Sequence, residues 1–145
     1  MKLLVLNGPN LNLLGVREPS VYGTQNYEEL VRLIEAHAEA CGVSVQCVQT
    51  NHEGVLVDEI QRAYFEGFDG IILNPAAYTH TSVALYDAVK AVGIPTVEVH
   101  ISDTENREAF RKISFVRSAC VKTIQGRGFQ GYLEAMDYLI GEVRK

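Results

Sequence analysis

The sequence has few of the features that mark secreted, membrane or disulfide-rich proteins. Its three cysteines, Cys41, Cys47 and Cys120, are odd in number and show no metal-ligand spacing, so we expect free thiols in a reducing compartment. The apolar run at residues 3–6 is too short for a signal peptide or a membrane span. Together these absences predict a cytoplasmic protein that does not lie in a membrane.

A surplus of positive charge is also missing. The chain has 13 Lys and Arg residues against 18 Asp and Glu residues, which gives a formal net charge of −5. Because general nucleic-acid binding requires a basic surface, this balance predicts no nucleic-acid partner. The chain has 145 residues and no linker, repeat or low-complexity segment, so we expect a single domain over residues 1–145.

The usual phosphate and metal motifs of α/β proteins are absent from the sequence. No Gly-x-x-x-x-Gly-Lys-Ser/Thr motif occurs, and Pro9 stands where a dinucleotide-binding turn would need a backbone amide. A phospho-receiver needs carboxylates after its first and third strands, but both places here carry asparagine, Asn7 and Asn74. The sequence therefore predicts acid–base chemistry on a small polar molecule, without a metal ion or a nucleotide.

Apolar runs and helical patterns alternate along the whole chain. We expect strands at residues 3–6, 43–48, 70–74, 96–101 and 119–124, and helices at residues 26–41, 55–65, 82–92, 107–113 and 132–143. Strands separated by helices pair in parallel with right-handed crossovers. Five such units predict an α/β fold, a flavodoxin-like three-layer α/β/α sandwich with a five-stranded parallel sheet of order 2-1-3-4-5.

The helical patterns also predict helix ends and buried faces. Asn26 and Glu29 have the spacing of a capping box, and Gly42 and Gly93 follow helical segments as end signals. The side chains expected to face the core are Leu30, Val31, Ile34, Ala38 and Cys41, then Leu56, Ile60, Ala63 and Tyr64, and finally Tyr132, Met136, Leu139, Ile140 and Val143.

The connection between the first strand and the first helix is unusually long. It has about twenty residues, where such connections usually have about 2–6. It carries Arg17 and Tyr22 between two glycines, Gly15 and Gly23. Long loops in compact domains are mostly functional or disordered, so we expect this one to act as a lid over a site.

Polar side chains follow several of the expected strands. In open α/β sheets, ligands bind outside the carboxyl ends of the strands, at the switch point between strands one and three. Asn10 follows the first strand, and Asn74 and His80 follow the third. Glu98 and His100 end the fourth strand, and the period of two places them on one face. These residues predict a polar crevice at this edge of the sheet.

Six motifs, in order and over nearly the whole chain, resemble those of type II 3-dehydroquinate dehydratases. They are Asn7-Gly-Pro-Asn-Leu-Asn-Leu-Leu-Gly15, Arg17-Glu-Pro-x-x-Tyr22-Gly23, Asn74-Pro-x-x-Tyr-Thr-His80-Thr-Ser82, Glu98-Val-His100-Ile-Ser102, Arg107-x-x-Phe-Arg111 and Gly128-Phe-x-Gly-Tyr132. The resemblance implies a shikimate-pathway lyase that converts 3-dehydroquinate to 3-dehydroshikimate and water. It also implies anti elimination through an enolate, no cofactor, and a homododecamer of four trimers.

The resemblance assigns the catalytic roles to a small set of side chains. Tyr22 is implied to be the base that removes the proton α to the carbonyl, and His100 the acid that protonates the leaving hydroxyl. Ionising half of a free tyrosine at neutral pH costs about 4 kcal/mol. A guanidinium about 4 Å away supplies about as much at an effective dielectric of about 20, which suits Arg17. Glu98 would orient His100, and Asn10 would position a water that stabilises the enolate.

The implied substrate-binding residues follow the third and fourth strands. Asn74 would hold the imidazole and a substrate hydroxyl. The backbone amides of Ile101 and Ser102, at the expected start of a helix, would bind the substrate carboxylate.

Four further residues complete the implied set. His80 and Arg111 would hold ring hydroxyls, and Arg107 would help to anchor the lid. Asp87 would reach the site of a neighbouring subunit, which fits the implied dodecamer. The 103–106 and 122–127 segments look less typical of the family.

Two alternative functions stay open at this point. One is a non-catalytic flavodoxin-like module that binds a nucleotide or flavin, although no phosphate loop is present. The other is a hydro-lyase or isomerase that acts on a different hydroxylated ring acid.

Overall fold

Five parallel strands form the central sheet in this computed structural model, which describes residues 1–16, 18, 20 and 24–145. The strands are β1 (Lys2–Asn7), β2 (Ser44–Gln49), β3 (Gly70–Asn74), β4 (Thr96–His100) and β5 (Lys122–Gln125). Their order is β2-β1-β3-β4-β5, and neighbouring strands pair in parallel throughout. The predicted flavodoxin-like order is confirmed.

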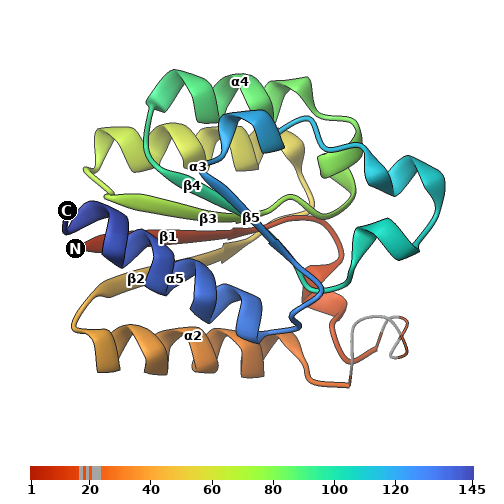
Figure 1. Ribbon diagram of the computed structural model, residues 1–145, viewed down its shortest axis with the longest axis horizontal. Helices are drawn as coiled ribbons and strands as arrows, with labels where there is room; N and C mark the ends of the chain where they lie inside the picture. Colours follow the sequence, from red (N-terminus) through yellow and green to blue (C-terminus); the bar gives the residue numbers. More distant parts are fainter. Residues whose placement is uncertain (17, 19, 21–23) are drawn as a thin grey trace.

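Helices cover both faces of the sheet (Figure 1). The α-helices of the described residues are α2 (Tyr27–Cys41), α3 (Glu53–Phe65), α4 (Val83–Val92) and α5 (Gln130–Val143). Helices α2 and α5 pack on one face and α3 and α4 on the other, which confirms the three layers. None of the helices in the described part of the chain is long and apolar enough to cross a membrane.

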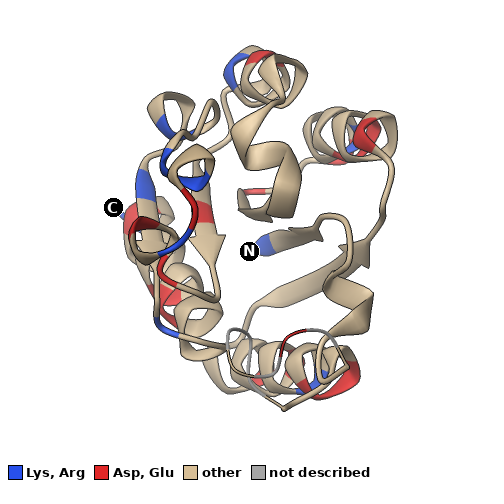
Figure 2. Ribbon diagram, turned by 90° about the vertical axis from the view of Figure 1, so that its right-hand side faces the viewer, with Lys and Arg blue, Asp and Glu red and all other residues tan. Residues whose placement is uncertain are grey.

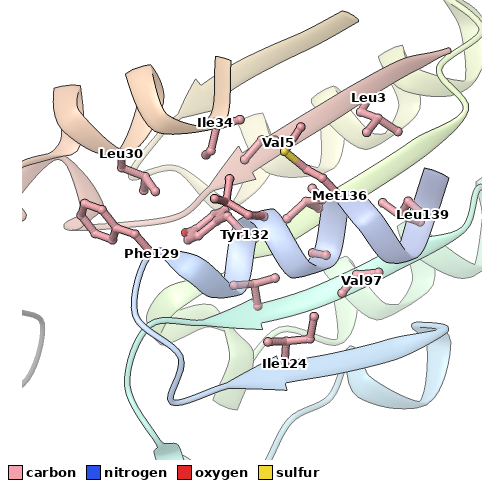
Figure 3. Packing of buried hydrophobic residues seen from close by; sticks show 14 of the residues in the cluster. Leu3, Val5, Leu30, Ile34, Val97, Ile124, Phe129, Tyr132, Met136 and Leu139 are labelled. Carbon is pink, nitrogen blue, oxygen red and sulfur yellow. The ribbon is translucent and has the colours of Figure 1, made fainter. Parts of the chain in front are cut away.

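Two hydrophobic cores lie on either side of the sheet because side chains alternate along each strand. Leu3 and Val5 of β1 face α2 and α5, whereas Leu4 and Leu6 face α3 and α4, and all four are fully buried. Figure 3 shows the first of these cores, with Tyr132 of α5 at its centre. Burial on both faces explains why the strand reads as a continuous apolar run.

The helix ends follow the predicted signals. The side chain of Asn26 accepts a hydrogen bond from the backbone N of Glu29 at 2.9 Å, which caps α2. Gly42 ends the same helix with a φ of 70°, a conformation that favours glycine. The side chain of Ser82 caps α4 in the same way by accepting from the backbone N of Leu85 at 3.0 Å.

The segment between β4 and β5 differs from the prediction. The expected helix at residues 107–113 is replaced by short 3-10 turns, η3 (Thr104–Asn106) and η4 (Ala109–Lys112), and η5 (Arg117–Ala119) occupies the expected start of the fifth strand. Phe110 and Ile113 are exposed, so this segment has no apolar stripe to hold a longer helix against the sheet. Strand β5 therefore begins at Lys122 rather than at residue 119.

Four of the side chains expected in the core lie at its margin. Tyr64 is 59% exposed and Val143 is 37% exposed, so these two expectations were wrong, and Val31 and Cys41 are half-buried. Tyr64 lies about 100° around α3 from Ala63, off the stripe that packs on the sheet. Val143 is the last residue of α5.

A buried hydroxyl joins the ends of β1 and β3 to α5. The Oη of Tyr132 donates to Asn7 Oδ1 at 2.6 Å and accepts from Asn74 Nδ2 at 2.8 Å. Burial raises the pKa of the Tyr132 hydroxyl despite the hydrogen bond from Asn74, so this group stays protonated. Asn7 and Asn74 are paired directly in the β1–β3 register, and one hydroxyl therefore bonds to both amides.

Replacing Tyr132 with phenylalanine will lower the free energy of unfolding by about 2–4 kcal/mol, because two buried amide atoms each lose a partner. Urea denaturation at a fixed protein concentration measures this change. Tyr138→Phe, the same chemical change on the same helix at a half-buried site, is the matched control and should cost less than about 0.5 kcal/mol. Equal losses in the two variants would contradict this account of the hydroxyl.

The loops after β1 and β3 approach each other closely. Gly8 N donates to Asn74 O at 2.8 Å, and a Cβ atom added at Gly8 would lie 2.5 Å from Pro75 O. Only glycine fits this approach without a shift of the backbone. The contact fixes the relative position of the two loops at the carboxyl edge of the sheet.

Candidate active site

A pocket opens at the carboxyl ends of the strands. This edge of the sheet faces the viewer in Figure 2. Its walls come from the segments that follow β1, β3 and β4, and its empty volume, including solvent at the mouth, is about 460 Å³. The lining residues are Leu11, Asn74, Ala76, Ala77, His80, His100, Ile101, Ser102, Thr104, Arg107 and Arg111. The pocket thus lies at the edge of the sheet where the sequence predicts a polar crevice.

His100 is the last residue of β4 and is only 6% exposed. Its Nε2 lies 2.5 Å from Glu98 Oε2. A carboxylate oxygen can only accept, so Nε2 carries a hydrogen atom and the other ring nitrogen, Nδ1, is the atom that can exchange a proton. The predicted pair of Glu98 and His100 on one face of β4 is present.

Glu98 lies behind His100 and is fully buried. Besides His100, its carboxylate accepts from Arg117 Nε at 3.1 Å, Ser114 Oγ at 2.8 Å and Thr123 Oγ1 at 3.1 Å. Burial raises the pKa of Glu98, but the hydrogen bonds and charges of His100 and Arg117 outweigh it and hold the pKa at about 2. Glu98 is therefore an anion that can orient His100 and stabilise its protonated form.

Sequence reasoning missed the three other partners of Glu98. Arg117 lies 19 positions along the chain in a 3-10 turn, and its side chain is 36% exposed. Ser114 and Thr123 are 16 and 25 positions from Glu98. Thr123 lies on β5 directly beside Glu98 in the sheet register. The predicted strand order, combined with the correct start of β5, would therefore have indicated this contact. No sequence signal indicates the other two.

Wild-type protein will lose stability in acid because folding holds Glu98 ionised. Its contribution is fully present above its ordinary pKa of 4.5 and is lost as the pH falls through about 2. The shift corresponds to roughly 3 kcal/mol. Between about pH 5 and about pH 2, wild type should therefore lose about 3 kcal/mol more of its free energy of unfolding than Glu98→Gln does. Urea denaturation across this range, with exposed Glu39→Gln as the control, tests this, and parallel curves for wild type and Glu98→Gln would contradict it.

His80 lies at the end of η2 (Ala76–His80) in the pocket wall. Its Nδ1 lies 2.6 Å from Ile113 O, so Nδ1 donates and Nε2 is left as the acceptor of the neutral ring. Burial lowers the pKa of His80, and the nearby charge of Arg111 adds to this, although the hydrogen bond to Ile113 opposes it. A neutral His80 can accept a hydrogen bond from a hydroxyl group in the pocket.

Two arginines give the pocket a cationic wall. Arg107 Nη1 donates to Ser102 Oγ at 3.4 Å, and its Nη2 lies 3.6 Å from Glu18 Oε2 in the long loop. Arg111 Nε donates to Glu108 Oε2 at 2.6 Å. These positions suit an anionic ligand, and the ion pair with Glu18 fits the predicted role of Arg107 as an anchor of the loop.

In the described part of the chain, no helix begins at Ile101 and Ser102. A 3-10 turn of three residues begins at Thr104 instead, and the side chain of Asp103 caps it by accepting from Glu105 N at 3.0 Å. The prediction that these amides stand at the start of a helix was therefore wrong. Both residues nevertheless line the pocket, where their backbone amides remain candidates for a carboxylate.

Asn74 is 3% exposed at the base of the pocket, and its side chain is already engaged. Besides the bond to Tyr132, its Oδ1 accepts from Ala76 N at 3.1 Å. Ala76 has a φ of 53°, a strained conformation that this bond helps to hold. Within the described residues, Asn74 makes no hydrogen bond to His100, so the structure does not bring about the predicted contact with the imidazole.

Two predicted site residues lie away from the pocket wall. Asn10 is exposed, with a φ of 71°, and its backbone N donates to Asn51 Oδ1 at 3.0 Å. Asp87 is exposed on α4. The roles predicted for Asn10 in holding a water and for Asp87 in a neighbouring subunit stay predictions.

Part of the predicted lid lies outside the described residues. This applies to Arg17 and Tyr22, the predicted partner and base. The described side of the site therefore contains the predicted acid His100, its carboxylate partner and the binding wall.

The motif resemblance is supported by comparison with known proteins. The family model described as dehydroquinase class II matches residues 1–140. A 3-dehydroquinate dehydratase of Caldicellulosiruptor bescii is 51% identical over 142 residues, which cover 98% of this chain and 97% of that protein. The crystal structure of a type II dehydroquinase from Butyrivibrio crossotus has a TM-score of 0.96 and 50% identity, and covers 97% of each chain. A second type II dehydroquinase structure, from Propionibacterium acnes, has a TM-score of 0.93 and 37% identity, with 97% of this chain and 96% of that chain covered. With its sheet order, its pocket and these matches, the chain belongs to the class II dehydroquinase family of hydro-lyases.

Proposed function

We propose that this chain is a 3-dehydroquinate dehydratase that eliminates water from 3-dehydroquinate to give 3-dehydroshikimate, a step of the shikimate pathway. The relatives of about 50% identity carry this activity in their names. The observation that supports it best is the Glu98–His100 pair at the wall of a pocket that also contains two arginines. A buried carboxylate bonded to a pocket histidine is an arrangement suited to general acid catalysis.

The proposed reaction is an anti elimination through an enolate. A base removes a proton α to the ketone, and the electron pair of the C–H bond forms the enolate. The enolate then re-forms the ketone and expels the β-hydroxyl, which takes a proton from His100 and leaves as water. The base gains one proton and His100 loses one. Before the next turnover the base must release a proton to solvent, and His100 must take one from solvent.

His100 suits the proposed role because of the direction of its hydrogen bond. With Nε2 bonded to Glu98, the protonated ring carries its second N–H at Nδ1, and this atom would serve the leaving hydroxyl. The fixed carboxylate favours the imidazolium before transfer and keeps the ring oriented afterwards. His80, as a neutral acceptor, would bind a ring hydroxyl, and the cationic wall with the Ile101 and Ser102 amides would bind the carboxylate.

Tyr22 is the proposed base and Arg17 its partner. The support is the Arg17-Glu-Pro-x-x-Tyr22-Gly motif on the long loop. A nearby guanidinium offsets the roughly 4 kcal/mol that phenolate formation costs at neutral pH, provided that the pair is not deeply desolvated. Loop closure would then bring the base to the face of the substrate opposite His100.

Incubation of purified protein with 3-dehydroquinate tests the proposal. We expect the ultraviolet absorbance of the conjugated enone to appear, and we expect it to survive a metal chelator. Folded protein without this signal would contradict the proposed function. Tyr22→Phe should keep substrate binding but lose turnover, and an unchanged kcat would exclude Tyr22 as the base. The exposed Tyr64→Phe is the matched control.

Membership of an enzyme family counts against the alternative of a non-catalytic nucleotide or flavin module. The alternative substrate, another hydroxylated ring acid, is separated by a substrate panel in the same assay. The proposal also includes a dodecamer in which Asp87 reaches the site of a neighbouring subunit. It further includes a cytoplasmic location. Light scattering measures the oligomeric state, and a dimer or monomer with full activity would exclude the dodecamer.

A further inference from the structure

Three side chains of different metal-ligand type meet on the outer surface, away from the residues that line the pocket. His37 and Cys41 lie one turn apart on α2, and Asp137 lies on α5. His37 Nε2 is 2.7 Å from Asp137 Oδ1 and 3.6 Å from Cys41 Sγ. All three ligand atoms lie within 4.8 Å of one another, and no other such group of three occurs in the described residues. We call these residues the α2–α5 cluster.

Hydrogen bonding in the α2–α5 cluster engages Asp137 closely and Cys41 only weakly. Both contacts involve the same ring nitrogen of His37, and that nitrogen either carries one proton or offers one lone pair. If it carries the proton, it donates to the carboxylate of Asp137, and no lone pair remains to accept from the thiol of Cys41. If it does not, the lone pair faces the carboxylate oxygens. A cation between the three side chains would be attracted to all of them, because each offers a lone pair or a negative charge.

The distances suit a tetrahedral ion. With metal–nitrogen and metal–sulfur distances of zinc proteins, a tetrahedral angle places the two ligand atoms about 3.6 Å apart. The observed distance from His37 Nε2 to Cys41 Sγ is 3.6 Å. The corresponding nitrogen–oxygen distance is about 3.3 Å, so Asp137 must withdraw slightly. Its side chain is 60% exposed and free to adjust.

We propose that His37, Cys41 and Asp137 bind a divalent cation of the zinc type, with water as the fourth ligand. Thiolate, imidazole and carboxylate together select a borderline-soft metal and disfavour Mg²⁺ and Ca²⁺, which prefer oxygen ligands. The exposed side of the cluster leaves room for the water. The ion joins α2 to α5, two helices that pack into the same core, and so stabilises the folded chain.

The sequence contains one half of this signal. His37 and Cys41 have the i, i+4 spacing that places two ligands on one face of a helix. The third ligand lies 100 positions after His37, and only the packing of α2 beside α5 brings it near. The sequence-based prediction of no metal site rested on spacing alone.

Metal binding is tested on the full chain after treatment with a chelator and removal of it. Zinc is titrated in competition with a chromogenic indicator, and cobalt is added separately to record its absorption spectrum. We expect one equivalent per chain and, for cobalt, a thiolate charge-transfer band with intense tetrahedral bands. Cys41→Ser and Asp137→Asn should each lower the zinc affinity by more than about tenfold. Zinc should raise the thermal midpoint of wild type by about 5 °C at saturation, and that of Cys41→Ser by much less.

Matched controls separate this site from general metal binding. Cys120→Ser removes a thiol whose pKa burial raises to about 12, and His52→Gln removes an exposed imidazole on another helix end. Both controls should bind zinc like wild type. Wild type without stoichiometric binding would overturn the proposal, and so would a Cys41→Ser variant that binds as tightly as wild type. The ligands are exposed or half-buried, so the variants should fold, and circular dichroism of the metal-free proteins checks this.

Discussion

Replacing His100 with alanine will lower kcat by roughly 10²–10⁴-fold, the usual effect of removing a general acid or base. The hydroxyl must then leave without a proton, while the groups that bind the substrate remain. KM should therefore change much less than kcat. Glu98 keeps Arg117, Ser114 and Thr123 as hydrogen-bond donors, so the variant should fold. Steady-state kinetics with 3-dehydroquinate measure both constants.

Added imidazole provides a second test of the same residue. The alanine variant has space beside Glu98 where the ring stood, and free imidazole in the buffer should restore part of the lost kcat. Alanine at the exposed His52 is the control and should leave kcat unchanged. A normal kcat in His100→Ala would remove His100 from the chemistry.

Replacing Glu98 with glutamine will lower kcat by about 10³–10⁴-fold, the scale seen when the carboxylate that orients a catalytic histidine becomes an amide. The amide has almost the same shape, but its NH₂ group can face His100 Nε2 and force the wrong tautomer. The lost charge also leaves Arg117, 3.1 Å away, without its counter-ion. The protonated ring would then be less stable, and the alkaline limb of the kcat–pH profile should move to lower pH.

Arg117→Gln is the matched variant for this effect. It removes a partner of Glu98 without touching the residues that line the pocket. Among the hydrogen-bond partners of Glu98 in the described residues, His100 is then the only charged one, since Ser114 and Thr123 are neutral donors. The alkaline limb should therefore move to higher pH, opposite to Glu98→Gln. Shifts in the same direction would show that both substitutions act through loss of structure rather than through charge.

The arrangement of the sheet could be predicted because each strand carries its own pattern. Leu3–Leu6 is a run of apolar residues that only burial on both faces explains, and glycines such as Gly42 stand where helices end. The 104–120 segment could not be predicted in this way. Short 3-10 turns bury no regular stripe, so Thr104, Arg107 and Arg111 come to the pocket through tertiary contacts that no periodicity records.

The candidate site shows the same division. Glu98 and His100 could be placed because they are two residues apart on one strand, and period two fixes their common face. The contacts of Asn74 could not, because its partner Tyr132 lies 58 positions later on a helix. Arg117 reaches Glu98 from an irregular turn for the same reason. Local spacing predicts neighbours within an element, whereas contacts between elements depend on packing.

The close approach of Gly8 to Pro75 has a consequence for redesign of the enzyme. Any side chain at residue 8 would push apart the two loops that carry Asn10 and Ala76, because the added atom would lie 2.5 Å from Pro75 O. The positions of these two loops are therefore fixed relative to each other, and a new substrate must fit the space that they leave. Libraries that seek altered substrate range should vary the exposed positions of the short turns beside the pocket, residues 105, 106, 109, 110 and 112. They should leave residues 8 and 75 and the lining residues Thr104, Arg107 and Arg111 unchanged.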